Sequence, residues 1–134
     1  MAHFRRTWPV TVLLATSLLV AGRAVVADIQ TLRLGTNPPV EVMRFFAGDA
    51  LMAAVSLLAL MALMTRRSWA PRATVAWMVT VIAVVGWVLF LAIGAAGPPL
   101  WLRISIWLAC GTLGAYAVHV VRREWGTRAE TAAA

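Results

Sequence analysis

The sequence predicts an all-α integral membrane protein, a four-helix bundle with both termini in the cytoplasm. Of its 134 residues, 62% are hydrophobic and only 13% are charged, whereas a soluble domain is roughly 45–50% apolar and about 25% charged. Four apolar runs are long enough to cross a hydrocarbon core of ~30 Å. These runs show no alternation of apolar and polar residues, and open strands in lipid would leave backbone groups unpaired. Helices are therefore expected throughout.

The helix boundaries follow from the ends of the apolar runs and from the prolines. Proline fits the first turn of a helix, because its missing N–H would have no partner there. Pro38 and Pro71 therefore open helices, with Asn37 as a candidate N-cap and Glu41 in a first turn, where the helix dipole favours an anion. The whole chain, 1–134, is expected to be a single transmembrane domain. Its helices are expected over about residues 8–27, 38–65, 72–94 and 98–122, with an outer loop at 28–37, an inner loop at 66–71 and an outer loop at 95–97.

The arginines predict the orientation. The formal net charge is +7, and all 12 basic residues are Arg. Almost all of this net charge lies on the side that holds both termini, and short cytoplasmic loops retain positive charge. We therefore expect a multi-pass protein of the inner cell membrane with both termini inside. The arginines are expected to contact anionic lipid headgroups and not nucleic acid.

The first apolar run has a second interpretation. Arg5 and Arg6 precede it, and Val25-Val26-Ala27 is an acceptable cleavage pattern for a signal peptide. Arg23 fits poorly in such a peptide, so we expect the span to be retained. Cleavage would leave three spans and a mature chain that begins at Asp28.

Arg23 and Asp49 are charged residues inside the predicted spans. With a rise of about 1.5 Å per residue, the two lie at nearly the same depth, below the outer headgroups. An ionisable group in lipid is costly and needs a partner. We expect an Arg23–Asp49 ion pair that sets the register of the first two helices, and a role in ion, proton or ligand handling is the alternative.

The first outer loop carries several polar residues around its two prolines. Ile29, Leu32 and Leu34 would let its first half lie on the membrane surface. The segment is either a well-capped connector or a docking surface for a partner or ligand on the outer face. The candidate docking residues are Asp28, Arg33, Asn37, Glu41 and Arg44.

Small residues in the fourth span predict a helix-packing face. Cys110, Gly111, Gly114 and Ala115 follow a spacing that lets another helix approach closely. Cys110 is the only cysteine, so no disulfide can form within the chain.

Trp87 and Trp107 lie deeper than the aromatic belt that usually marks membrane interfaces. Packing within the chain is the simplest role for them. Contacts with a lipid tail, a pigment or quinone, or another subunit are the alternatives.

The sequence does not predict an enzyme. It contains no Ser/His/Asp set, phosphate-binding loop, metal-ligand cluster or pair of carboxylates at core depth, so no catalytic, cofactor-binding or metal-binding residue is assigned. His119 lies near the inner boundary and has no second histidine facing it in another span, so haem ligation by this residue is not expected.

Part of the chain, about residues 34–67, resembles a known family. The matching residues are Leu34-Gly35-Thr36-Asn37-Pro38-Pro39-Val40-Glu41, then Gly48-Asp49-Ala50-Leu51 and Arg66-Arg67. They are similar to the ferric-reductase-like family, and in particular to the haem-binding membrane subunit of the periplasmic methionine sulfoxide reductase system. The resemblance implies a helical membrane fold and quinone-linked electron transfer. Where that family carries a haem histidine, this chain has Gly86-Trp87-Val88-Leu89-Phe90, so haem or quinone is expected only with a partner subunit.

Taken together, these features predict an accessory or structural subunit of a membrane complex, such as a respiratory or electron-transfer assembly. A small oligomeric transporter or channel, with Arg23 and Asp49 near its outer gate, is the first alternative. A haem- or quinone-associated electron-transfer subunit is the second. The expected partners are membrane lipids and other membrane subunits or a second copy of the chain.

Overall fold

Nearly all of the chain is helical in a computed structural model, which describes the backbone of residues 2–134 and the side chains from Arg6 onward. A π-helical segment (Val88–Ala92) and a 3-10 turn (Gly94–Ala96) connect the third and fourth helices. The described residues contain no strand, which confirms the all-α class. The four long helices are α1 (Ala2–Leu34), α2 (Pro39–Met64), α3 (Ala70–Trp87) and α4 (Leu100–Ala133).

Each of these helices is long and apolar enough to cross a membrane. The shortest candidate span, Ala70–Ala92, has 23 residues, which corresponds to about 34 Å at 1.5 Å per residue. The span in α1 has 29 residues, or about 44 Å by the same rise. Because the hydrocarbon core is ~30 Å thick, α1 must tilt or project beyond it.

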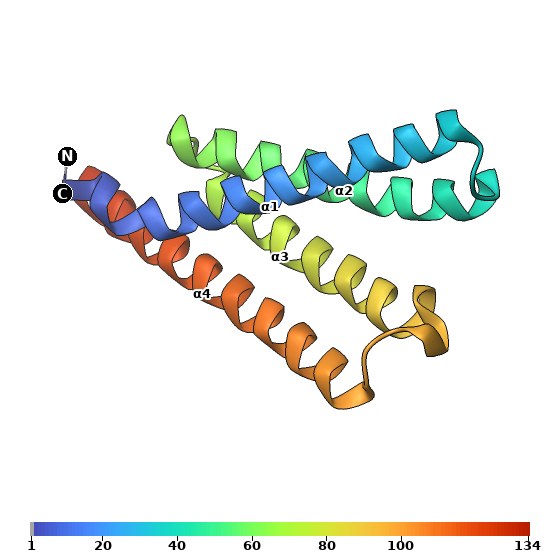
Figure 1. Cartoon of the computed structure of the whole chain (residues 1–134). Helices are drawn as coiled ribbons and strands as arrows, with labels where there is room; N and C mark the ends of the chain where they lie inside the picture. Colours follow the sequence, from blue (N-terminus) through green and yellow to red (C-terminus); the bar gives the residue numbers. More distant parts are fainter. Residues whose placement is uncertain (1) are drawn as a thin grey trace.

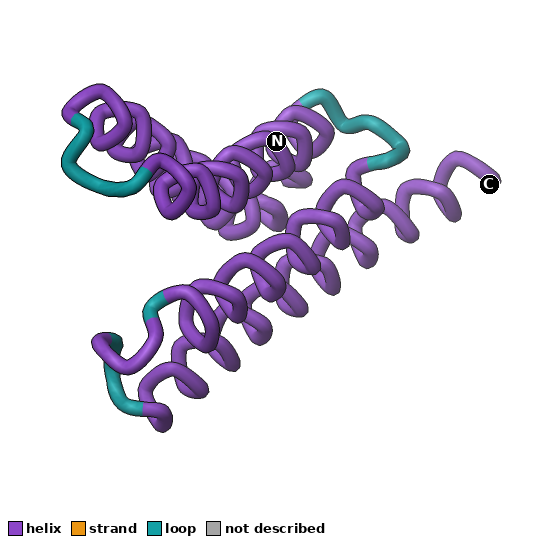
Figure 2. Tube along the Cα trace, turned by 90° about the vertical axis from the view of Figure 1, so that its right-hand side faces the viewer, coloured by secondary structure: helices purple, strands orange, loops and turns teal. Residues whose placement is uncertain are grey.

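The helices form two hairpins that diverge (Figure 1). α1 packs along α2, α3 packs along α4, and α2 joins the hairpins by packing on α3, whereas α1 and α4 have few contacts. Both termini lie at the end where the hairpins meet, which we call the termini end. Toward the other end, the proline end, the backbones of the two hairpins diverge in both views (Figures 1 and 2), while Phe45 of α2 and Trp87 of α3 keep their side chains in contact.

α1 continues beyond its predicted end at residue 27, so the outer loop expected at 28–37 is wrong. α1 ends at Leu34, and Asp28 and Arg33 are helical. No glycine or proline interrupts the chain between Gly22 and Gly35. Gly35 then adopts φ +64° and its N–H donates to the carbonyl oxygen of Thr31 at 3.1 Å, the left-handed helix end that glycine favours.

α4 also extends beyond its predicted end, from residue 122 to Ala133. The added segment lacks proline and is rich in Arg, Glu and Ala, which favour helices. Glu124 and Arg128, four residues apart, form an ion pair with 3.9 Å between Arg128 Nε and Glu124 Oε1. Hydropathy therefore located the end of the apolar run near residue 122 but not the end of the helix, which continues to Ala133.

The start of α2 confirms part of the predicted capping. Pro39 is the first helical residue and Glu41 lies in the first turn. Asn37, however, does not cap the helix, because Pro38 occupies the N-cap position and no side chain there bonds to the backbone. The second proline shifts the helix start by one residue, so Asn37 lies in the turn before it.

A polar network joins three helices within the apolar bundle. The hydroxyls of Ser17 in α1 and Ser56 in α2 share a hydrogen bond of 2.9 Å. The indole N–H of Trp77 in α3 donates to Ser17 Oγ at 3.0 Å. Ser56 and Trp77 are buried, so each polar group finds a partner away from water and the network fixes how the three helices face one another.

Arg103 organises the connection between α3 and α4. Its guanidinium donates to the carbonyl oxygens of Pro98 at 2.6 Å, Leu89 at 2.9 Å and Gly94 at 2.6 Å. The last carbonyls of a helix have no partner within the helix, and here an arginine from the next helix supplies donors. Gly94, with φ +63°, gives the backbone the left-handed turn that brings these carbonyls together.

Candidate functional site

Arg23 does not form the expected ion pair with Asp49. Its side chain is exposed, and among the described residues no ion pair joins it to a carboxylate. Asp49 instead interacts with Asp28. Arg23 and Asp28 are five residues apart and thus about 140° apart around α1, so both cannot face α2, and Asp28 is the one that does.

Asp28 and Asp49 form an acidic pair between α1 and α2. Their carboxyl groups are close enough for a side-chain hydrogen bond, and Asp28 Oδ2 is buried without a hydrogen-bond partner among the described residues. We missed this pair in the sequence because Asp28 was assigned to a loop. The continuous helical pattern up to Gly35 was the signal for it.

Only two of the five candidate docking residues come together. Glu41 and Arg44 line a pocket of about 360 Å³ at the proline end, between the start of α2 and the end of α3, and Trp87 forms part of its wall. Arg33 and Asn37 are exposed, and Asp28 belongs to the acidic pair. The docking loop is therefore not one surface in this fold.

The small residues of α4 divide between two directions. Gly114 is buried, and a Cβ added there would lie 2.6 Å from Met78 Cγ in α3. Cys110 packs against the same core. By contrast, nothing lies within 4 Å of a Cβ added at Gly111, and Ala115 is exposed. Cys110 and Gly114 thus pack within the chain, whereas Gly111 and Ala115 face outward.

Gly111 and Ala115 lie in an outward groove of about 300 Å³ between α3 and α4, which we call the α4 groove. Trp107 forms a fixed wall of it, because its indole N–H donates to the carbonyl oxygen of Ile82 at 3.0 Å. The Trp107 ring also meets Phe90 edge to face at 5.9 Å. The lining residues are Ile82, Trp107, Leu108, Gly111, Thr112 and Ala115.

Trp87 and Trp107 both contact aromatic side chains within the chain. Trp87 packs on Phe45 of α2, with 5.7 Å between ring centroids. Gly86 leaves room for the Trp107 indole, since a Cβ there would lie 2.9 Å from Trp107 Nε1. These contacts agree with the packing role, the simplest of the roles that the sequence suggested for the two residues.

Other residues that shape the sites escaped our sequence analysis. Ser17, Ser56 and Arg103 were not singled out, although polar residues within membrane spans often mark contacts between helices. Trp77 belongs to the same network, because its indole N–H donates to Ser17. In the described part of the chain, no three His, Cys, Asp or Glu side chains gather into a potential metal site.

No family model, curated protein or solved structure matches this chain. Its class therefore rests on its own fold: an all-α chain with four helices able to cross a membrane. Its candidate sites are an acidic pair between α1 and α2 and a groove on α4. The resemblance to the ferric-reductase-like family stays a prediction.

Proposed function

We propose that this chain is an accessory subunit of a membrane complex and that a transmembrane helix of another subunit packs in the α4 groove. The observation that carries the proposal is the outward position of two small residues: a Cβ added at Gly111 would meet no atom within 4 Å, and Ala115 is exposed. Respiratory and electron-transfer assemblies are candidates for such a complex. Any haem or quinone would then be bound with a partner subunit.

The physical basis is the way helices associate in lipid. Lipid tails are as apolar as the side chains, so helix association depends on close van der Waals packing, which small residues four apart allow. Gly111 and Ala115 have this spacing. Trp107 is held by Ile82 and Phe90, so the groove needs little ordering when a helix enters it.

The Gly111→Leu substitution tests this proposal. We expect partner subunits to be lost on purification in mild detergent, with the co-purified amount falling about tenfold, which corresponds to roughly 1.4 kcal/mol of binding free energy. The fold should persist because the new side chain meets no atom within 4 Å at its Cβ. Co-purification is measured by mass spectrometry, and the fold by circular dichroism during heating.

Ala109→Leu is the matched control. Ala109 is exposed on the same helix but lies about 160° away from Gly111 around its axis, so the partner should remain bound. If the wild-type chain purifies as an isolated monomer, or if both variants lose the partner equally, the subunit proposal is wrong. A dimer of identical chains would favour the oligomeric transporter.

A second function, proton or cation transfer, is favoured by the acidic pair. Asp28 and Asp49 lie between two spans, and Asp28 Oδ2 has no protein partner among the described residues. Ionisable groups within a membrane often mark ion pathways and proton relays. In this proposal Asp28 takes the place that the sequence analysis gave to Arg23, so that Asp28 and Asp49 together form the gate.

Proton flux into liposomes tests the second function. We expect vesicles that contain the wild-type chain and a trapped pH-sensitive dye to dissipate an imposed proton gradient. Asp49→Asn and Asp28→Asn should each lower this rate more than about tenfold, as expected when an essential proton carrier is removed. Arg23→Gln, which changes an exposed residue of the same helix as Asp28, should leave the rate unchanged. Equal flux in Asp49→Asn and wild-type vesicles would rule this function out.

We also propose that both termini are cytoplasmic and that the protein resides in the inner cell membrane. The support is the distribution of arginines, because basic residues near span ends are retained on the cytoplasmic side. Four described arginines lie toward the proline end: Arg23, Arg33, Arg44 and Arg103. Those of the termini end are Arg6, Arg66, Arg67, Arg72, Arg122, Arg123 and Arg128.

A further inference from the structure

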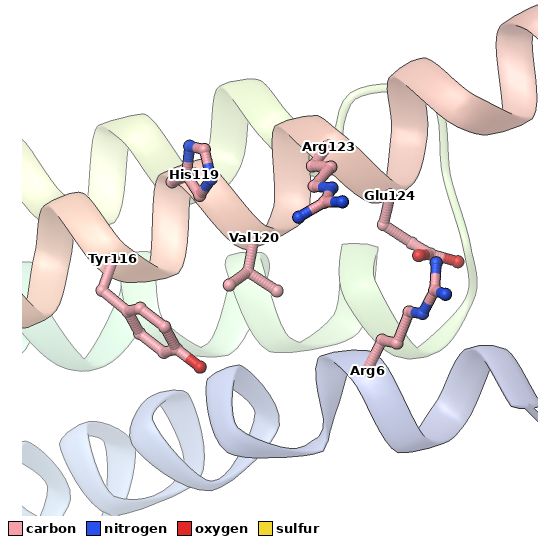
Figure 3. Close-up of a pocket in the computed structure, with 6 residues that line it drawn as sticks. All are labelled: Arg6, Tyr116, His119, Val120, Arg123 and Glu124. Carbon is pink, nitrogen blue, oxygen red and sulfur yellow. The ribbon is translucent and has the colours of Figure 1, made fainter.

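A polar pocket opens between α1 and α4 at the termini end, away from the sites described above. It has a volume of about 400 Å³. Figure 3 shows His119 and Arg123 projecting from α4, the Tyr116 hydroxyl directed toward α1, and Arg6 reaching from α1 toward Glu124. Its lining residues are Arg6, Tyr116, His119, Val120, Arg123 and Glu124.

The charges of this pocket favour an anion. Arg6 and Arg123 carry permanent positive charges, and His119 adds an N–H donor in either protonation state. Glu124 is the only acidic residue among those that line the pocket. It is 4% exposed, and Arg128, which does not line the pocket, pairs with it. A ligand in the pocket therefore meets mainly positive charge.

Hydrogen-bonding groups here remain available for a ligand. The side chains of Tyr116, His119 and Arg123 make no hydrogen bond or ion pair with any other residue that the structure describes. Arg123 accepts a hydrogen bond from Thr127 Oγ1 at 2.8 Å, but with its backbone carbonyl oxygen. Tyr116 precedes Arg123 by seven residues, or about 10 Å along the helix, on the membrane side. The available side-chain donors thus extend along α4 from Arg123 into the apolar span.

Aromatic residues place this pocket at the level of lipid headgroups. Trp125 follows Arg123 by two residues, and its indole N–H donates to the carbonyl oxygen of Arg67 at 2.8 Å. Trp8, two residues after Arg6, is exposed. Tryptophans of this kind are enriched at the boundary between membrane and water. From this level α1 and α4 diverge toward the proline end (Figure 1).

We propose that the pocket binds the headgroup of an anionic phospholipid. Arg6, Arg123 and His119 hold the phosphate, for which the planar guanidinium fork is well suited. The Tyr116 hydroxyl donates to an ester carbonyl oxygen deeper in the membrane. A free phosphate could also be held by Arg6, Arg123 and His119. It could not reach the Tyr116 hydroxyl at the same time, because Tyr116 lies about 10 Å from Arg123 along the helix. The line of donors therefore favours a lipid.

Native mass spectrometry of the full chain, released from mild detergent in the presence of added lipid, tests this proposal. We expect phosphatidylglycerol to remain bound at concentrations where phosphatidylcholine does not. Arg123→Gln should weaken phosphatidylglycerol binding about tenfold, the change that one charge-assisted hydrogen bond contributes. Tyr116→Phe should weaken it severalfold. The side chains of Arg123 and Tyr116 contribute no hydrogen bond to the described fold, so both variants should remain folded.

Arg72→Gln is the matched control for charge. Arg72 is exposed at the same end but lies on α3 and does not line the pocket, so its loss should change lipid binding less than twofold. Equal weakening by Arg72→Gln and Arg123→Gln would overturn the proposal, since it would indicate a diffuse surface charge. Binding of inorganic phosphate that depends on Arg123, without binding of phosphatidylglycerol, would also overturn it.

Discussion

Replacing Trp77 with alanine is expected to lower the free energy of unfolding by about 3 kcal/mol, the loss typical of a buried tryptophan. Trp77 is 4% exposed and packs in the core shared by the helices. Its indole also donates to Ser17, which is bonded to Ser56. The substitution therefore removes packing from α3 and leaves a hydroxyl of the network without its donor. Unfolding in detergent micelles, followed by circular dichroism, measures the loss.

Two further variants separate the contributions of Trp77. Trp77→Phe keeps most of the packing and loses the N–H, so the cost should be about 1 kcal/mol, the net value of one hydrogen bond between helices. Trp101→Ala removes an indole that is 68% exposed and should change stability by less than about 0.5 kcal/mol. If Trp77→Ala costs no more than Trp101→Ala, the network does not hold the three helices together.

Replacing Arg103 with glutamine is expected to release the connection between α3 and α4. The guanidinium bonds three carbonyl oxygens, of Pro98, Leu89 and Gly94, and a charged hydrogen bond contributes roughly 1.5–3 kcal/mol. Since such bonds are not additive, we expect a loss of about 3 kcal/mol in the local opening free energy. Hydrogen exchange of amides in residues 88–97 should accelerate about a hundredfold.

Arg44→Gln and Arg103→Lys serve as controls for this prediction. Arg44 lies at the same end and is exposed, so its loss should leave exchange in residues 88–97 unchanged. Lysine keeps the charge but lacks the fork of donors, so Arg103→Lys should give an intermediate rate. Exchange in Arg103→Gln that matches the wild type would show that the turn is held by its own backbone and not by Arg103.

The fold class could be predicted from local properties of the sequence. A run of apolar residues of sufficient length, together with the absence of alternation, admits only helices in lipid. The prolines were nearly as informative: α2 begins at Pro39, one residue after the predicted Pro38, and Pro71 lies in the first turn of α3 as predicted. Both predictions depend on neighbouring residues alone.

Helix ends were harder to predict because hydropathy and helicity stop at different places. In α1, Asp28 and Arg33 end the apolar run, and yet the helix continues to Leu34. Gly35 ends it, because its positive φ closes the last turn. If Gly35, and not Asp28 and Arg33, is taken as the end of the helix, Asp28 lies on a helix face and becomes a candidate partner of Asp49.

The chain's apolar and charged composition was sufficient to establish its four helices and their capacity to cross a membrane. The rotation of each helix about its own axis depended on packing between distant segments. In a soluble helix, polar residues mark the outer face. Here both faces are apolar, so nothing local to the sequence indicates that Gly114 faces Met78 while Gly111 faces outward. The same holds for Asp28, which meets Asp49 because α1 and α2 pack together at one particular rotation.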